Sequence, residues 1–95
     1  MDGAWLYILR CSDDSFYVGT TRSSVEQRVN EHQQGIFDGY TAQRLPVALM
    51  FAEHFPRIED AIAAERRVKG WRRDKKIALI EGRLGDLPGL SRRKG

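Results

Sequence analysis

The chain has 95 residues, of which 41% are hydrophobic and 31% are charged, fractions close to those of globular proteins and far from those of disordered chains. This length supports one hydrophobic core, so the sequence predicts a single domain. No apolar stretch approaches the roughly 18 residues that span a bilayer, and the first residues lack the features of a secretory signal. The single cysteine, Cys11, excludes an intramolecular disulfide, and we expect a cytoplasmic protein.

Positive charge is concentrated in the last third of the chain. Residues 1–64 hold 5 Lys and Arg against 9 Asp and Glu, a balance of −4, whereas residues 65–95 hold 11 against 4, a balance of +7. Seven of these basic residues fall within eleven positions: Arg66, Arg67, Lys69, Arg72, Arg73, Lys75 and Lys76. Such a patch is typical of binding to nucleic acid or to an anionic membrane surface, although a solvated helix face has the same composition.

The first half of the chain predicts a β-hairpin followed by a helix. Segments 4–11 and 16–20 are rich in aromatic and branched residues, and a short run of turn-forming residues separates them. Two overlapping capping boxes begin at Ser23 and Ser24 and predict a helix over residues 24–34.

The second half predicts one more strand and two more helices. Residues 36–46 show no helical period and predict a loop, and apolar alternation from Val47 predicts a strand that ends before Pro56. Helices are predicted over residues 58–69 and 73–81. The order β-β-α-β-α-α indicates an α+β fold with a three-stranded sheet packed against helices.

Ionisable residues fall on the apolar faces of two predicted helices. At about 100° per residue, Glu65 lies within the apolar stripe of its helix, and Arg28 and His32 share a face with the valines of theirs. Charges are rarely buried unless they are paired, bound to a metal or functional. For Glu65 the structural alternative is an ion pair with Lys69 or with an arginine from elsewhere. For Arg28 it is a stem laid over apolar surface, and for His32 a hydrogen-bonded boundary position.

The predicted hairpin adds two phenol groups on adjacent strands, Tyr7 and Tyr17. The structural alternative is that both are core residues with hydrated hydroxyls, as most tyrosines in strands are. Gly19 marks a point where another backbone or a ligand can approach closely. We expect the polar groups of the hairpin and of the two helices to converge in one small site: Tyr7, Tyr17, Arg28, His32 and Glu65.

Several short motifs follow one another between residues 4 and 81. They are Trp5-Leu6-Tyr7-Ile8-Leu9, Phe16-Tyr17-Val18-Gly19, Arg28-Val29-Asn30-Glu31-His32, Tyr40-Thr41, Pro46-Val47-Ala48-Leu49 and Ala64-Glu65. In order and spacing they resemble the GIY-YIG endonuclease superfamily. The resemblance implies a three-stranded antiparallel sheet flanked by helices, with a nuclease domain over residues 1–82. The composition of residues 83–95, with Gly85, Pro88, Gly89 and a basic end, predicts a flexible, basic tail.

The resemblance also implies a role for each residue of the expected site. Tyr17 corresponds to a general base, Tyr7 to a residue that positions water or phosphate, and Arg28 to one that stabilises the phosphate. His32 corresponds to a position held by His or Tyr in relatives, and Glu65 to the ligand of one Mg²⁺ or Mn²⁺ ion. The implied function is hydrolysis of DNA, with repair or recombination of branched or damaged DNA as its setting.

A second hypothesis keeps the same scaffold without turnover, as a module that binds nucleic acid or recruits a partner. Thr20 stands where several superfamily members have lysine, and the only asparagine, Asn30, precedes Glu65 instead of following it. The sequence is also compatible with a DNA-targeting protein partner, or with a homodimer formed through the basic segment.

Overall fold

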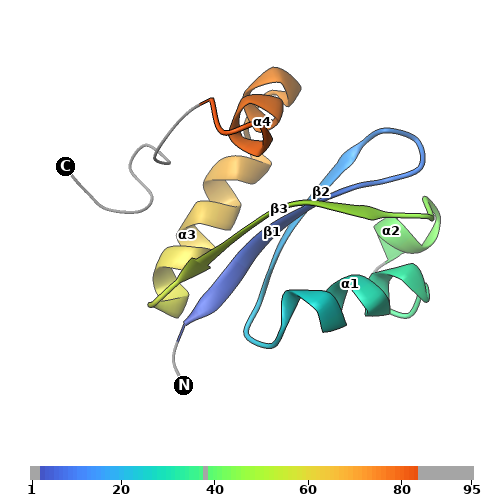
Figure 1. Ribbon diagram of the computed structural model, residues 1–95, viewed down its shortest axis with the longest axis horizontal. Helices are drawn as coiled ribbons and strands as arrows, with labels where there is room; N and C mark the ends of the chain where they lie inside the picture. Colours follow the sequence, from blue (N-terminus) through green and yellow to red (C-terminus); the bar gives the residue numbers. More distant parts are fainter. Residues whose placement is uncertain (1–2, 38, 84–95) are drawn as a thin grey trace.

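The computed structural model describes residues 3–37 and 39–83. Figure 1 shows a three-stranded antiparallel sheet with helices beside it, which confirms the predicted α+β class. Within these residues no helix is both long and apolar enough to cross a membrane. The expected tail, apart from Arg83, lies outside the described residues.

The order of elements agrees with the prediction except for one additional short helix. The elements are β1 (Ala4–Arg10), β2 (Phe16–Thr21), α1 (Val25–Gln33), α2 (Gly39–Ala42), β3 (Ala48–Phe55), α3 (Ile58–Lys69) and α4 (Arg73–Ile80). The prediction of a loop over residues 36–46 is therefore wrong where α2 forms. A helix of four residues makes about one turn, which is too short to produce a detectable period in the sequence.

The turn between β1 and β2 is held by its own polar side chains. Asp14 adopts a φ of 74°, a left-handed conformation that aspartate tolerates better than most residues. The Asp13 carboxylate accepts hydrogen bonds from the Ser15 backbone N–H at 3.0 Å and hydroxyl at 2.6 Å, and from Arg44 Nε at 3.0 Å. The hydrogen bonds from Ser15, reinforced by Arg44, lower the pKa of Asp13. The hairpin is thereby tied to the segment that follows α2.

Local capping explains where α1 begins and ends. Of the two capping boxes in the sequence, the structure uses the second, because Ser24 Oγ accepts a hydrogen bond from the Gln27 backbone N–H at 3.0 Å. After the helix, Gly35 adopts a φ of 73°, which glycine reaches without strain.

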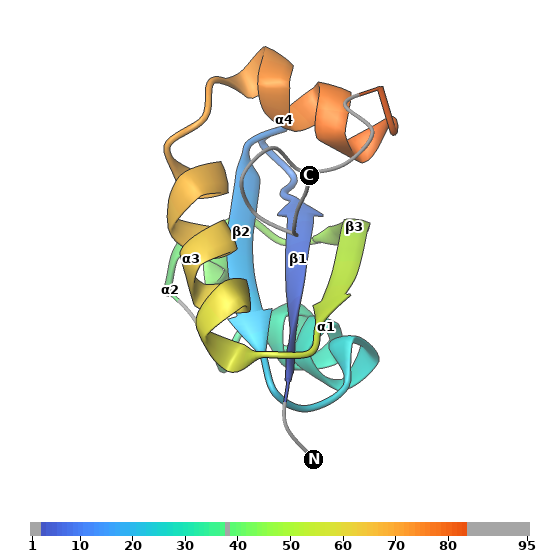
Figure 2. The same ribbon diagram turned by 90° about the vertical axis from the view of Figure 1, so that its left-hand side faces the viewer.

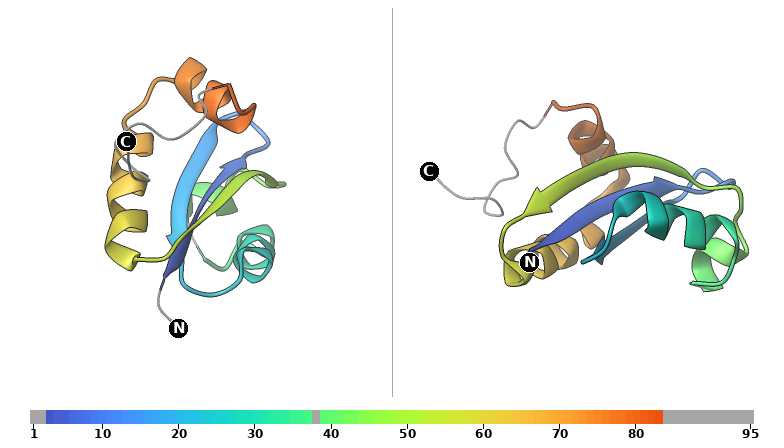
Figure 3. Two further views of the ribbon diagram at one scale, coloured as in Figure 1. Left: turned by 60° about the vertical axis from the view of Figure 1, so that its left-hand side comes forward. Right: turned by 60° about the horizontal axis from the view of Figure 1, so that its bottom comes forward.

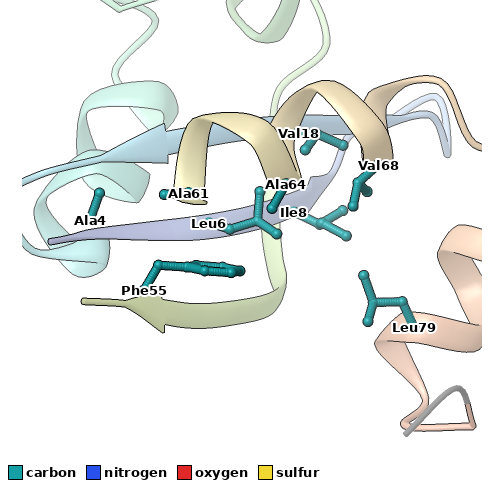
Figure 4. Packing of buried hydrophobic residues seen from close by; sticks show 9 residues of the cluster. All are labelled: Ala4, Leu6, Ile8, Val18, Phe55, Ala61, Ala64, Val68 and Leu79. Atoms are coloured by element: carbon teal, nitrogen blue, oxygen red, sulfur yellow. The ribbon is translucent and has the colours of Figure 1, made fainter. Parts of the chain in front are cut away.

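Strand β1 lies in the middle of the sheet and contributes to a core on each face. The core beneath α3 and α4 consists of Ala4, Leu6, Ile8, Val18, Phe55, Ala61, Ala64, Val68 and Leu79 (Figure 4). The core beneath α1 consists of Tyr7, Leu9, Cys11 and Val47, with Val25 and Val29 packed against it. Because both faces are covered, residues 6–9 form a continuous buried run.

The helices divide between the two faces of the sheet. The left view of Figure 3 shows the sheet between α3 and α1, and Figure 2 shows α4 crossing the end of the sheet near the β1–β2 turn. The order of strands is β2-β1-β3, so β2 and β3 are edge strands. This arrangement leaves the edge of β2 as the place where helices from opposite faces approach one another.

The predicted third strand is present, but a bulge interrupts its alternation. Ile8 pairs with Phe51 and Leu9 pairs with Leu49, so Met50 is an extra residue in β3. The extra residue shifts the alternation of side chains between the two faces of the sheet. Leu49 is therefore 44% exposed, although the sequence pattern groups it with buried Val47.

Candidate active site

Tyr7 and His32 form a buried hydrogen-bonded pair between β1 and α1. The Tyr7 hydroxyl lies 3.0 Å from His32 Nε2, and the Thr41 hydroxyl of α2 lies 2.7 Å from His32 Nδ1. Tyr7 is 1% exposed, and His32 and Thr41 are fully buried. Because both imidazole nitrogens have a hydrogen-bonding partner, β1 and α2 together hold the ring in one orientation.

Tyr17 of β2 covers this pair from the solvent side. Its ring centroid lies 5.0 Å from that of His32 and 6.4 Å from that of Tyr7. It also stacks on Tyr40, with the centroids 6.2 Å apart and the planes at 30°. The structure thus brings together three of the five expected residues, and partly exposed Tyr17 is the phenol that a bound molecule can reach.

Gly19 makes this arrangement of rings sterically feasible. It pairs with Tyr7 across the β1–β2 ladder, and the Tyr7 ring lies over its Cα. A Cβ atom at position 19 would lie 2.7 Å from Tyr7 Oη and 2.9 Å from Tyr7 Cζ. Any larger residue would therefore displace a buried phenol.

Replacement of Gly19 by alanine is expected to lower the free energy of unfolding by about 1–3 kcal/mol, the usual cost of overpacking. The neighbouring Tyr7 ring is buried and hydrogen-bonded to His32, so it has little room to move. Urea denaturation measures the change. Gly39→Ala is the matched control, because no heavy atom lies within 4 Å of its added Cβ. Equal losses for both variants would contradict the close contact between Tyr7 and Gly19.

Arg28 lies on α1 at the margin of the same cluster. Its guanidinium carbon is 4.2 Å from the centroid of the Phe37 ring, and that ring contacts His32 at a centroid distance of 4.8 Å. Arg28 Nε is 3.1 Å from Glu31 Oε1, yet this buried nitrogen is not aligned for a hydrogen bond to any described residue. The Arg28 side chain is 21% exposed, so most of it is packed against its neighbours, and it lines an open cavity.

Glu65 approaches the sheet from the other side, because α3 covers the opposite face. Its Oε1 accepts a hydrogen bond from the Thr20 hydroxyl at 3.0 Å, and its Oε2 lies 2.8 Å from Lys69 Nζ. The ion pair with Lys69 is the structural alternative that the sequence left open. Thr20, which stands where a lysine was expected from the resemblance, connects Glu65 to β2 directly beside Gly19.

The donor set at Glu65 suits a hard divalent cation. Within residues 3–37 and 39–83, no group of three or more His, Cys, Asp or Glu side chains could hold a metal ion. A lone carboxylate fits Mg²⁺ or Mn²⁺, whose other ligands are water and substrate phosphate, and does not fit a structural zinc site. Glu65 uses two of about four lone-pair positions. Lys69, which is 55% exposed, can turn away.

Two open cavities border the edge of β2 and join the two groups of helices. One, of about 400 Å³, is lined by Thr20 and Arg28 together with Ile62 of α3. The other, of about 330 Å³, is lined by Tyr17 and Tyr40 together with Lys69 and Lys76. Of the five expected residues, Arg28 lines the first of these cavities and Tyr17 the second, while Tyr7 and His32 are buried behind Tyr17.

The basic segment has structural contacts as well as exposed charge. Arg73 bonds to the Asp14 carbonyl oxygen at 2.6 Å and lies 3.2 Å from its carboxylate, and its guanidinium carbon is 4.4 Å from the Phe16 ring centroid. These contacts fix α4 against the hairpin turn. Burial, together with the charge of Arg73, lowers the pKa of Lys76.

Other basic residues have structural roles at helix ends. Arg66, Arg67 and Lys69 occupy the last turn of α3, where positive charge is favourable to the helix dipole. Lys75 Nζ lies 4.3 Å from the Trp71 ring centroid. The seven predicted nucleic-acid contacts are therefore not seven equivalent free charges, since these residues also stabilise α3 and α4.

Three residues that sequence reasoning did not include in the site contribute to its geometry. Thr41 orients His32, Phe37 supports Arg28, and Thr20 binds Glu65. Thr41 belongs to one of the short motifs, but no pattern connects it to a histidine nine positions earlier. Phe37 lies in the segment that was predicted to be a loop.

Comparison with known proteins assigns the chain to a family. A family model described as the GIY-YIG catalytic domain matches residues 3–78. The chain belongs to the GIY-YIG family. The match includes all five residues of the expected site and all seven predicted nucleic-acid contacts.

Relatives of this GIY-YIG chain have similar lengths. It is 41% identical over 80 residues to a UPF0213 protein of Haloquadratum walsbyi, covering 84% of this chain and 89% of the relative. It is 37% identical over 83 residues to a UPF0213 protein of Staphylococcus aureus, covering 87% of this chain and 100% of the relative. The solution NMR structure of a UPF0213 protein from Bacillus halodurans is similar, with a TM-score of 0.55, 36% identity and coverage of 90% and 88% of the two chains.

Proposed function

We propose that this GIY-YIG protein is a divalent-metal-dependent endonuclease that hydrolyses phosphodiester bonds in DNA. The observation that carries the proposal is the buried network of Tyr7, His32 and Thr41, which supports Tyr17 beside the margin where Arg28 lies. A polar network of this kind is a costly way to stabilise a core, and it preorganises reactive groups. Family membership supports the same chemistry.

In the proposed mechanism, Tyr17 accepts a proton from the attacking water. An isolated phenol, with a pKa of about 10, is a poor base at neutral pH, but nearby positive charge favours its ionised form. Tyr7 is too deeply buried to meet substrate in the same way, since it is 1% exposed. Tyr7 acts as a positioning residue. Its hydroxyl is hydrogen-bonded to His32, and the Tyr17 ring packs against the His32 ring.

Arg28 stabilises negative charge that develops on the phosphate. Its planar guanidinium can donate to two phosphate oxygens at once, which a lysine cannot reproduce. Glu65 would hold the divalent cation, which neutralises phosphate charge when it is bound. With that cation in place, Lys69 would be free to leave Glu65 and to contact the DNA backbone, together with the remaining basic residues of α3 and α4.

The setting that we propose is repair or recombination of branched or damaged DNA in the cytoplasm. The basic segment from Arg66 to Lys76 would contact the backbone on either side of the cleaved bond. A DNA-targeting protein partner, or a second copy of the chain, would extend that contact surface.

A non-catalytic nucleic-acid-binding or partner-recruiting module is the second candidate function, and the Glu65–Lys69 ion pair favours it. The ammonium group neutralises the carboxylate without any metal ion, at an Nζ–Oε2 distance of 2.8 Å. A pure binding module has no need of Mg²⁺ at Glu65. Calorimetric titration with Mn²⁺ therefore separates the two functions, whereas salt-dependent DNA affinity is common to both.

The test of the proposed function is cleavage of end-labelled DNA by the full chain. Duplex, single-stranded and branched substrates are incubated with Mg²⁺, with Mn²⁺ or with excess EDTA. We expect internal cuts in at least one substrate with metal and none with EDTA, because hydrolysis requires the charge that the cation supplies. Cleavage that persists in EDTA would contradict the metal requirement. Binding without cleavage under any condition, and without heat on addition of Mn²⁺, would establish the second function instead.

A further inference from the structure

The cavity beside Tyr17 has the size and composition of a nucleotide site. Its volume is about 330 Å³, at the lower end of the range for small-molecule pockets. Its walls are Phe16, Tyr17, Val18 and Tyr40, and its charged groups are Lys69 and Lys76. Aromatic rings next to ammonium groups offer a base a stacking surface and a phosphate a cation.

Tyr40 is the exposed part of the aromatic wall, and its neighbours hold it in position. Tyr40 is 39% exposed, stacks on Tyr17, and carries the Arg44 guanidinium carbon 3.9 Å from its ring centroid. Tyr40 is one of the exposed large hydrophobic residues among those described, and it lines the cavity. An exposed aromatic ring that its neighbours hold in place at the rim of a cavity gives a bound base a ready contact surface.

Lys76 supplies positive charge to the cavity. Within the described part of the chain, no acidic side chain pairs with Lys76, and its charge is opposed by burial and by Arg73. A bound phosphate would offset both effects. Lys69 also lines the cavity, and its ammonium group donates a hydrogen bond to Glu65.

We infer that the cavity formed by Phe16, Tyr17, Tyr40 and Lys76 receives an unpaired nucleotide of DNA. The base would lie against the aromatic wall and a phosphate would lie near Lys76. A base within a duplex is already stacked on both sides and paired, so it must be unpaired to enter such a cavity. The position of this nucleotide relative to the cleaved bond rests on the proposed function. Because Tyr17 also lines the cavity, the bound nucleotide would lie next to the bond that is cut. The substrate class is therefore DNA with an unpaired nucleotide at the cut, such as a single strand, a flap or an open junction.

The test is a binding experiment in EDTA, so it needs no hydrolysis. The probe is a single-stranded oligonucleotide with one central 2-aminopurine, compared with the same strand abasic at that position and with the fully paired duplex. We expect 2-aminopurine fluorescence to fall on binding, and the intact strand to bind about tenfold more tightly than the abasic strand. Tyr40→Ala is expected to remove this difference and Tyr40→Phe to retain it. Leu49→Ala, which removes a 44% exposed side chain from the distant strand β3, is expected to retain it as well.

Equal affinities of the full chain for intact and abasic strands, or tighter binding of the duplex, would overturn the inference. That comparison uses the unmodified protein, so it tests the nucleotide site even if Tyr40→Ala fails to fold. The binding test and the cleavage test can also fail independently of each other. Cleavage without discrimination against the abasic strand removes the nucleotide site and leaves the nuclease, whereas discrimination without cleavage supports the site and removes the nuclease.

Discussion

Replacement of Arg28 by alanine is expected to slow cleavage of DNA by about 10²- to 10³-fold, the usual effect of losing one group that stabilises transition-state charge. The physical reason is that Arg28 of α1 lies beside the Tyr17–His32 cluster, through Phe37, and lines an open cavity. Single-turnover rates on a saturating labelled substrate measure the effect. DNA affinity, measured in EDTA, is expected to change much less than the rate.

Arg28→Lys is the matched variant, because it retains the charge and loses the planar pair of donors. We expect it to recover only a small part of the lost rate. A lysine variant with the full rate would show that a point charge is sufficient and would contradict the bidentate role. An alanine variant with the full rate would show that the cleavage comes from elsewhere in the protein or from a contaminating nuclease. Folding is expected to change little, since the contacts with Phe37 and Glu31 are each worth about 1 kcal/mol or less.

Glu65→Gln is expected to reduce metal-dependent cleavage by a similar factor of about 10² to 10³, because the amide keeps the shape of the side chain and loses the charge that attracts the cation. The amide oxygen can still accept the hydrogen bond from Thr20, so the local structure is retained. The same variant is expected to lose the heat of Mn²⁺ binding in calorimetry. Glu59→Gln, which changes an exposed acid in the first turn of α3, is the matched control.

The ion pair between Lys69 and Glu65 provides a second test of the metal site by Mn²⁺ calorimetry. If the ammonium of Lys69 and a divalent cation compete for Glu65, Lys69→Met raises Mn²⁺ affinity by up to about fivefold, the equivalent of an exposed ion pair of up to 1 kcal/mol. Mn²⁺ binding that is the same in Glu65→Gln as in the parent would move the metal site away from α3. No detectable Mn²⁺ binding even in Lys69→Met would favour the non-catalytic module.

Local rules account for most of the elements that were predicted. The hairpin follows from two aromatic and branched segments around a polar turn, and the start of α1 follows from Ser24, because both effects act within a few residues. The inward position of His32 is likewise visible in the helical period, and the structure buries it completely. Two features escaped such rules. The turn of α2 is shorter than a detectable period, and the bulge at Met50 arises from pairing with β1, which is distant in sequence.

The amino-acid sequence by itself determined the family, the order of strands and helices apart from the short helix α2, and the inward position of His32 and Glu65, because motif order, capping and periodicity depend on residues that are close in sequence. Only the tertiary structure decided that α1 and α3 cover opposite faces, and that Glu65 therefore reaches the edge of β2 from the side away from Tyr7 and His32. It also decided between the ion pairs open to Glu65 and joined His32 to Thr41. These outcomes depend on how the helices pack across the sheet, which brings together residues that no local pattern relates.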